Sequence, residues 1–443
     1  MTGTDYYLRL AATFAVAGLF GAAIFNPGAG KRIVSDVATA QAAASAVNTK
    51  TCASGEPPLE GPFAPIDDII SISPLGGVTA PGEPLPAPAI RLNTRKGKTI
   101  FDRRVTTALA PAKADITAIE RRTLRKDDGG ADREIWSVHF SVCDSVSLVY
   151  DDLDAIDASI LRRAGGLKSF AEIGGPDHLA IRTAVRVKKG DAIGTANGFD
   201  VMLEDARATP AQFDRPERYQ SNTYAEARAI SAPEAVLKAI ASDVSRIECP
   251  LDYLPERTAA EWKAKLGDAW GIRRAGGEDA CRTAIVDKKG AAQGVWFTDA
   301  ANNGRTSKVS AVALAPDSID PGKLIFALHG RVKSLMPNMI ALNPFLKDEK
   351  AEAARDFLTF EAMNGRINAA FAEVRPGEVY CYQNLRVNFV GPKVNGVLLL
   401  EIEPQTSTGA PPLMKIEARG DILSCIDLPD PWGFSGQETT FYR

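Results

Sequence analysis

Large apolar side chains alternate with small or polar ones over much of the stretch from about residue 98 to residue 205. In Ile135–Val142, Trp136 and Val138 fall on one face, and Ser137 and His139 fall on the other. This period of two is typical of a half-buried strand. Ser147–Tyr150 and Phe199–Glu204 follow as further strands. The pattern predicts a β domain over residues 66–210.

Two segments of this region resemble each other. Val105–Ile119 and Ile181–Ala196 each read as a short strand, a tight polar corner and another short strand. The second corner, Lys188–Asp191, contains Gly190, which suits a turn that needs positive φ. Two such hairpins predict a barrel-sandwich-hybrid-like fold. Their wide spacing, and the absence of a Met-Lys-Met or Asp-Lys-Ala tip, disfavour a lipoyl or biotinyl carrier.

The apolar period becomes helical between residues 211 and 268. Ser231 and Pro233 begin an amphipathic helix that runs to Val244, and Thr258–Leu266 forms a second helix that ends at Gly267. These helices predict a connector between two β domains.

Residues 269–443 again favour strands. One helix is expected over Asp348–Phe360. Gly, Pro and Asn separate the strand candidates, which predicts a second β-rich domain. The candidates are Ala284–Val286, Gly294–Thr298, Val309–Leu314, Lys323–His329, Glu378–Tyr382, Gly396–Ile402 and Leu413–Glu417.

The N-terminus carries an uncharged apolar run of 16 residues, Leu10–Phe25. As a helix it would span about 24 Å, less than the roughly 30 Å hydrocarbon core of a membrane. Residues 1–32 are therefore interpreted as a signal peptide, with an N-terminal membrane anchor as the alternative. Residues 33–65 are rich in Ala, Ser, Thr and Pro, which predicts a flexible tether.

Composition narrows the classes of partner and compartment. The chain has 443 residues and a net charge of -3, so nucleic acid is not expected as a partner. The six cysteines are widely spaced, without a CxxC or a Cys/His cluster. Disulfides in an oxidising compartment and buried free thiols are both compatible with this spacing, and the pairing is open. The disulfide candidates are Cys52, Cys143, Cys249, Cys281, Cys381 and Cys425.

Several short segments together resemble the lysostaphin-type (LytM-like) zinc endopeptidases over about residues 74–205. They are the entry Pro81–Glu83, the elements Ala108–Pro111 and Val149–Leu153, the Val185–Gly194 hairpin and the closing strand Phe199–Glu204. The resemblance implies the duplicated hybrid motif of that family. It also implies a zinc ion, held by histidines and an aspartate, that acidifies water for attack on a peptide bond.

The histidines that the resemblance calls for are absent. Glu83 stands at the entry, with Ala87 and Ala89 as neighbouring candidates, and Asp152 stands before Leu153. Asp200 and Met202 stand on the closing strand. We therefore expect no catalytic residue, no metal ligand and no cofactor, with a remnant groove lined by Glu83, Asp152, Asp200 and Met202. A solvated acidic patch, a Ca²⁺ site and a carboxylate pair of the glycosidase type are alternatives.

The chain has only three histidines. The alternation at His139 indicates a surface or inter-strand residue, and His178 follows a glycine-rich loop and is expected in solvent. His329 ends a strand of the second β domain. None is expected to replace a missing zinc ligand.

The sequence therefore predicts an exported protein with a catalytically degenerate peptidase-like domain. It would bind peptidoglycan or an envelope protein, and it would contact the membrane if its N-terminal segment is uncleaved. The alternatives are an active zinc metalloendopeptidase with atypical ligands, which would cleave peptidoglycan cross-bridges, and a structural envelope protein without glycan binding.

Overall fold

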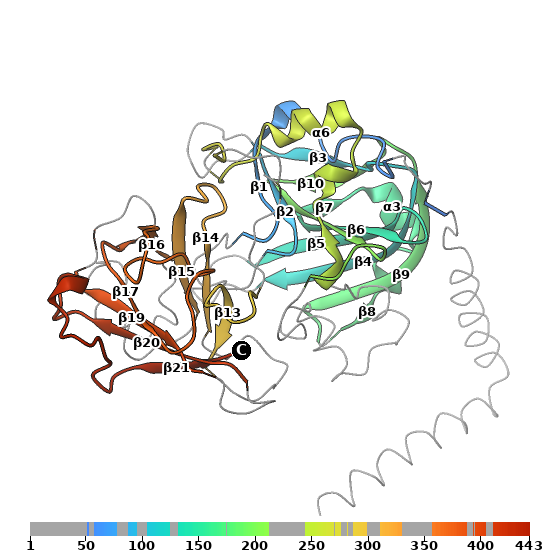
Figure 1. Cartoon of the computed structure of the whole chain (residues 1–443). Helices are drawn as coiled ribbons and strands as arrows, with labels where there is room; N and C mark the ends of the chain where they lie inside the picture. Colours follow the sequence, from blue (N-terminus) through green and yellow to red (C-terminus); the bar gives the residue numbers. More distant parts are fainter. Residues whose placement is uncertain are drawn as a thin grey trace, which may run out of the picture. The chain divides into compact units, whose positions relative to one another are not determined.

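The protein is mainly β, as predicted, and its strands belong to antiparallel sheets (Figure 1). The architecture comes from a computed structural model. It describes residues 51–52, 57–77, 87–94, 104–124, 132–173, 175–211, 244–269, 271–275, 281, 287–298, 311–329, 357–387, 393, 395–404 and 411–443. The predicted signal segment, most of the predicted tether and the first predicted connector helix lie outside these residues.

A large antiparallel sheet contains the strands that the alternation predicted. Its order is β1-β2-β11-β6-β5-β4-β9-β8, and β12 also pairs with β11. The strands are β1 (Ile69–Ser73), β2 (Ile90–Thr94), β4 (Ala114–Leu124), β5 (Arg133–Ser141), β6 (Val146–Leu153), β8 (Ala171–Glu172), β9 (His178–Val187), β11 (Phe199–Asp205) and β12 (Ile247–Glu248).

A three-stranded sheet accompanies the large one, in the order β3-β10-β7. Its strands are β3 (Thr106–Leu109), β7 (Ala155–Ile156) and β10 (Ala192–Ala196). The helices and 3-10 turns of the same region are η1 (Ile66–Asp68), α3 (Ala158–Arg163), η2 (Leu167–Ser169), η4 (Val244–Arg246), η5 (Pro250–Tyr253) and α6 (Glu256–Lys263).

The two similar segments cross between these sheets, so the prediction that each forms a hairpin is wrong. β4 pairs with β9 in the large sheet, and β3 pairs with β10 in the small one. The corners are bonded to each other: Ala110 N–H donates to Asp191 O at 2.9 Å, and Gly190 N–H donates to Ala110 O at 2.8 Å. Gly190 has φ 82°, as the sequence predicted for this turn. Each segment therefore contributes one strand to each sheet.

The core of this region joins both sheets. Tyr150 on β6 is fully buried against the rings of Phe63 and Phe199, with centroid distances of 6.3 and 5.2 Å. Its hydroxyl donates to Leu109 O on β3 at 2.8 Å, which satisfies the one polar atom of the ring. Phe63 also contacts Trp262 of α6 at 5.3 Å between centroids.

Two predicted segments belong to this core. Phe63 and Leu59, which the sequence assigned to the tether, are fully buried, so the folded region begins before Ile66. Trp262 of α6 is buried in the same core, and so is Cys281. A separate helical connector is not confirmed, because the described part of it packs within the first β region.

The C-terminal half forms a second large antiparallel sheet, in the order β17-β19-β20-β21-β13-β14-β15-β16-β18. Its strands are β13 (Gly294–Phe297), β14 (Ala311–Pro316), β15 (Lys323–His329), β16 (Phe357–Glu361), β17 (Val379–Tyr382), β18 (Arg386–Val387), β19 (Val397–Ile402), β20 (Leu413–Arg419) and β21 (Thr439–Tyr442), and η6 spans Cys425–Asp427.

The described end of the helix predicted over 348–360 is a strand instead. β16 pairs with β15, and Leu358 and Phe360 are buried in the second core. The rings of Phe326 and Tyr382 lie 5.7 and 5.1 Å from that of Phe360, between centroids. This cluster of large apolar side chains overrides the local helix-forming composition. The remainder of the predicted helix lies outside the described residues.

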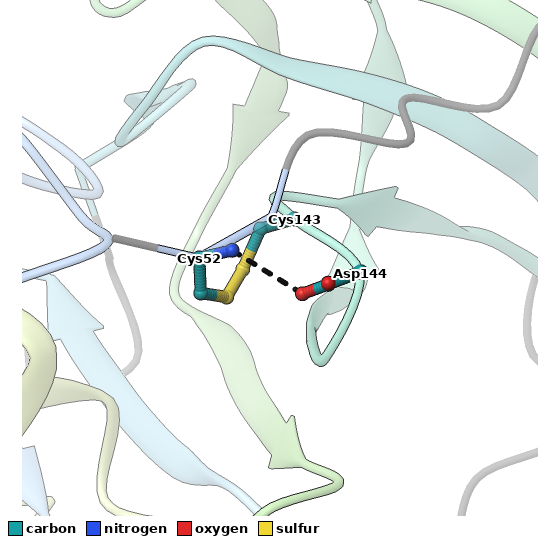
Figure 2. A group of neighbouring side chains, drawn as sticks. All are labelled: Cys52, Cys143 and Asp144. Carbon is teal, nitrogen blue, oxygen red and sulfur yellow. Dashed lines mark hydrogen bonds between the residues drawn. A yellow bond between two sulfur atoms is a disulfide. The ribbon is translucent and has the colours of Figure 1, made fainter. Parts of the chain in front are cut away.

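All six cysteines are paired. Cys52 joins Cys143, Cys249 joins Cys281, and Cys381 joins Cys425. The first disulfide closes a sequence separation of 91 residues, and the Cys52 amide donates to Asp144 Oδ1 at 3.2 Å (Figure 2). Three disulfides indicate an oxidising, extracytoplasmic setting. Among the described residues, none of the helices combines the length and apolarity needed to cross a bilayer.

We predict that the disulfides are reduced in a fixed order. Cys52 is half-buried, whereas Cys381 and Cys425 are fully buried, and an attacking thiolate must reach a sulfur atom. Brief treatment of the folded protein with dithiothreitol, followed by alkylation and peptide mass spectrometry, should label Cys52 and Cys143 before Cys381 and Cys425. In urea all pairs should be labelled together. Earlier labelling of Cys381 in the folded protein would contradict this order.

Candidate functional site

The structure brings two of the predicted groove residues together. Asp152 lies on β6 and Asp200 on β11, two neighbouring strands of the large sheet. Met202 is half-buried and lies on the same face of β11 as Asp200. The sequence also places Glu83 at the entry of the predicted groove, with Ala87 and Ala89 as neighbouring candidates. Glu83 lies outside the described residues.

One arginine joins the two aspartates. Arg91 stands on β2 directly opposite Asp200. Its Nη2 donates to Asp152 Oδ2 at 2.7 Å, and its Nη1 donates to Asp200 Oδ1 at 3.0 Å. A guanidinium offers several N–H donors in one plane, which lets it serve two carboxylates at once.

An irregularity in β6 allows Asp152 to take part. The pairing of β5 with β6 shifts register between Trp136 and Val138, and Asp152 has φ 63°. Neighbouring residues of a regular strand point to opposite faces, so a regular β6 would separate Asp151 from Asp152. The bulge and the left-handed backbone bring both carboxylates into ion pairs, Asp151 with Arg122 and Asp152 with Arg91 and Arg133.

The bridge belongs to a larger array that we call the aspartate–arginine cluster. Arg133 Nη2 lies 2.9 Å from Asp152 Oδ1 and 3.0 Å from Asp154 Oδ1. Asp151 is bonded to Arg122 and accepts from Ser137 Oγ at 2.6 Å. The charged members of the cluster are Asp151, Asp152, Asp154, Asp200, Arg91, Arg122 and Arg133.

Opposing influences act on the ionisation of the cluster. Burial raises the pKa of Asp200, Arg91 lowers it, and Asp151 raises it again, with a net value of about 6. Burial alone would lower the pKa of Arg91, but Asp200 and Asp152 outweigh burial and raise it. Arg91 therefore stays charged, whereas the pKa of Asp200 lies where mild acid protonates it.

A second group of ionisable residues lies on the neighbouring strands. Glu120 on β4 is buried, and its two carboxylate oxygens lie 2.6 Å from His139 Nε2 and 2.8 Å from His178 Nε2. Burial disfavours the charge of Glu120, but the hydrogen bonds to both imidazoles outweigh it and lower the pKa of Glu120 below its usual range. His139 is thus an inter-strand residue, one of the two positions expected for it.

The prediction for His178 is wrong. It is the first residue of β9 rather than part of a solvated loop, and its side chain is 18% exposed. The bond to Glu120 holds it against the sheet. His329 is the last residue of β15, as the sequence indicated.

Metal-ligand geometry is confined to one place among the described residues. There, ligand atoms of Cys52, Cys143 and Asp144 lie within 4.8 Å of one another. Both sulfur atoms already form a disulfide, which removes the thiolates that would bind a metal (Figure 2). Neither the aspartate–arginine cluster nor the Glu120 group brings three such atoms together in this way.

Comparison of the chain with family models, curated proteins and solved structures finds no match.

The sequence interpretation missed the basic partners of the site. Arg91, Arg122 and Arg133 were not singled out, and Glu120 was not connected to the histidines. A usable signal was present, because Glu120 and Arg122 are separated by one residue in a strand, as are Ser137 and His139. That period places each pair on one face, and charged residues on a sheet face need partners.

We predict that protonation of Asp200 stabilises the fold. A carboxyl with a raised pKa binds its proton more tightly in the folded state, so acidification from pH 7.5 to pH 5 should favour folding. Relative to Asp200→Asn, the wild type should gain about 1 kcal/mol of unfolding free energy over this range, after allowance for partial exposure. Urea unfolding at several pH values measures the difference. A difference that stays constant or shrinks on acidification would contradict the raised pKa.

The Glu120 group should have the opposite pH dependence. A lowered carboxyl pKa contributes stability that is fully present above the ordinary value of 4.5 and is lost progressively as the pH falls from 4.5 toward the folded-state pKa. Glu120→Gln should therefore cost about 2–4 kcal/mol near pH 7, because two buried imidazoles lose a charged acceptor. The cost should shrink below pH 4.5. Urea titrations of both proteins at pH 7 and pH 3 test this, and an equal cost at both pH values would contradict the lowered pKa of Glu120.

Proposed function

We propose that this chain is an exported cell-envelope protein whose first β region is a catalytically degenerate relative of the lysostaphin-type endopeptidases. In this proposal it acts as a binding or regulatory module for peptidoglycan or for an envelope partner. The N-terminal segment would direct export, either as a cleaved signal peptide or as a membrane anchor.

The observation that carries the proposal is which residues stand at the positions where the resemblance calls for zinc ligands. Two positions at which the resemblance calls for histidine hold Asp152 and Asp200, and both carboxylates are bonded to Arg91. A third such position holds Met202. The place where the resembling enzymes perform hydrolysis is here a neutralised array of ion pairs.

The architecture agrees with the proposed relationship. The proposed relationship predicts two similar segments in the first β region. Val105–Ile119 and Ile181–Ala196 are such segments, and they pair with each other through the β3–β10 and β4–β9 pairs.

Zinc does not fit the described residues. The two carboxylates are engaged by a guanidinium, and the histidines His139 and His178 are bonded to Glu120. A catalytic zinc site needs ligands that converge on one point and leave a position for water. For this reason the non-catalytic function is preferred to a metallopeptidase with atypical ligands.

The cluster is suited to contact with a polar polymer. Arg91 and Arg133 are 36% and 44% exposed, and Asp200 and Asp154 are 32% and 27% exposed. Donors and acceptors therefore alternate on a surface with little net charge. Such a surface can bind hydroxyl, amide and carboxylate groups, which are all present in peptidoglycan.

We predict that the full chain without residues 1–32 co-sediments with purified insoluble peptidoglycan. Arg133→Ala should weaken binding about tenfold, because it removes the most exposed guanidinium of the cluster. Arg419→Ala is the matched control, since Arg419 forms a comparable ion pair with Asp421 on the second large sheet. Sedimentation over a range of peptidoglycan concentrations gives the affinities.

The other outcomes identify the alternatives. Release of soluble cross-bridge fragments together with stoichiometric bound zinc would establish the peptidase. Failure of the wild type to sediment with peptidoglycan would instead favour a structural envelope protein or a protein partner. Equal weakening by Arg133→Ala and Arg419→Ala would place any binding outside the cluster.

A further inference from the structure

We propose that the guanidinium of Arg91 takes the place of a bound cation between Asp152 and Asp200. We further propose that this site is selective for a planar cation rather than a metal ion. This inference rests on the proposed function, because it explains why the peptidase-like site is permanently closed to metal.

The distances point to a guanidinium site. The two aspartates bond to different nitrogens of one planar group, at 2.7 and 3.0 Å. Metal ligands would instead converge on a single atom at a little over 2 Å. No trio of metal-ligand atoms in the described residues includes these carboxylates.

The surrounding contacts fix the carboxylates in this arrangement. Asp152 uses its other oxygen to bind Arg133 at 2.9 Å, and its side chain is only 16% exposed. Asp200 lies opposite Asp151, whose carboxylate is bonded to Arg122 and Ser137. Rotation of Asp152 toward a metal would break its bond to Arg133. The site is therefore organised by several strands and not by Arg91 alone.

The site is open enough to be tested by chemical rescue. The Arg91 side chain is 36% exposed, so its truncation leaves an opening that solutes can reach. In Arg91→Ala, the two aspartates lose their shared cation, and of the two only Asp152 keeps another cationic partner, Arg133. A free guanidinium ion has the same plane, donors and charge as the missing group.

The experiment measures the thermal unfolding temperature of the full chain without residues 1–32. Arg91→Ala should unfold about 3–6 °C below the wild type. Guanidinium chloride at about 5–20 mM, far below the molar range in which it denatures proteins, should recover at least half of this loss. Urea at the same concentration has the shape without the charge, and CaCl₂ and ZnCl₂ have charge without the shape. These three solutes should recover little.

Two variants make the result specific. Arg91→Ala combined with Asp200→Asn should lose the rescue, because one carboxylate of the site is gone. Arg207→Ala should show no rescue, since Arg207 pairs with the single carboxylate of Asp205. The inference is overturned if guanidinium fails to stabilise Arg91→Ala, if it stabilises both control variants equally, or if Ca²⁺ or Zn²⁺ rescues better. No peptidoglycan is present, so failure here leaves the binding proposal to its own sedimentation test.

Discussion

The first β region depends on the mutual hydrogen bonds of two chain corners. Ala110 and the Gly190–Asp191 turn exchange backbone bonds at the point where each segment leaves one sheet for the other. Ala110 is buried, so its backbone groups would otherwise be unsatisfied. Because the two corners bond to each other, each segment can place one strand in the large sheet and its other strand in the small sheet. The aromatic core around Tyr150 then fills the space that the sheets enclose.

The opposite face of the large sheet follows from the same arrangement. Because one face is committed to the core, charged side chains on β2, β4, β5, β6 and β11 are directed to the other face and become neighbours across the strands. These charged side chains are partly buried, where an isolated ion would be energetically costly. They therefore form ion pairs with one another. The bulge at Asp152 completes this neutralisation by adding a carboxylate that a regular strand would point elsewhere.

The sequence predicted the elements better than their connections. Alternation at Ile135–Val142 identified β5 and assigned Trp136 and His139 to opposite faces. The strand is not half-buried as predicted, because Ser137 and His139 are buried too. Pairing is a non-local property, so two similar strand–corner–strand segments were interpreted as hairpins although they pair with each other. The strand Phe357–Glu361 was missed because its aromatic partners lie in β15 and β17.

The site was predicted in outline only. The resemblance identified Asp152 and Asp200 as neighbours, and the structure places them on one guanidinium. Arg91 gave no signal of its own, because a single arginine between Ile90 and Leu92 looks like an ordinary exposed strand residue. The positive φ of Asp152 could not be predicted from the sequence either, since aspartate also occupies regular strands.

The disulfide between Cys52 and Cys143 has a mechanical consequence. It links the start of the described chain covalently to the end of the β5 region, which lies in the middle of the large sheet. Tension applied through the preceding residues therefore reaches the fold first at an interior strand, where several hydrogen-bonded neighbours share the load. Without the bond, the same tension would peel residues 57–65 away from the core one contact at a time.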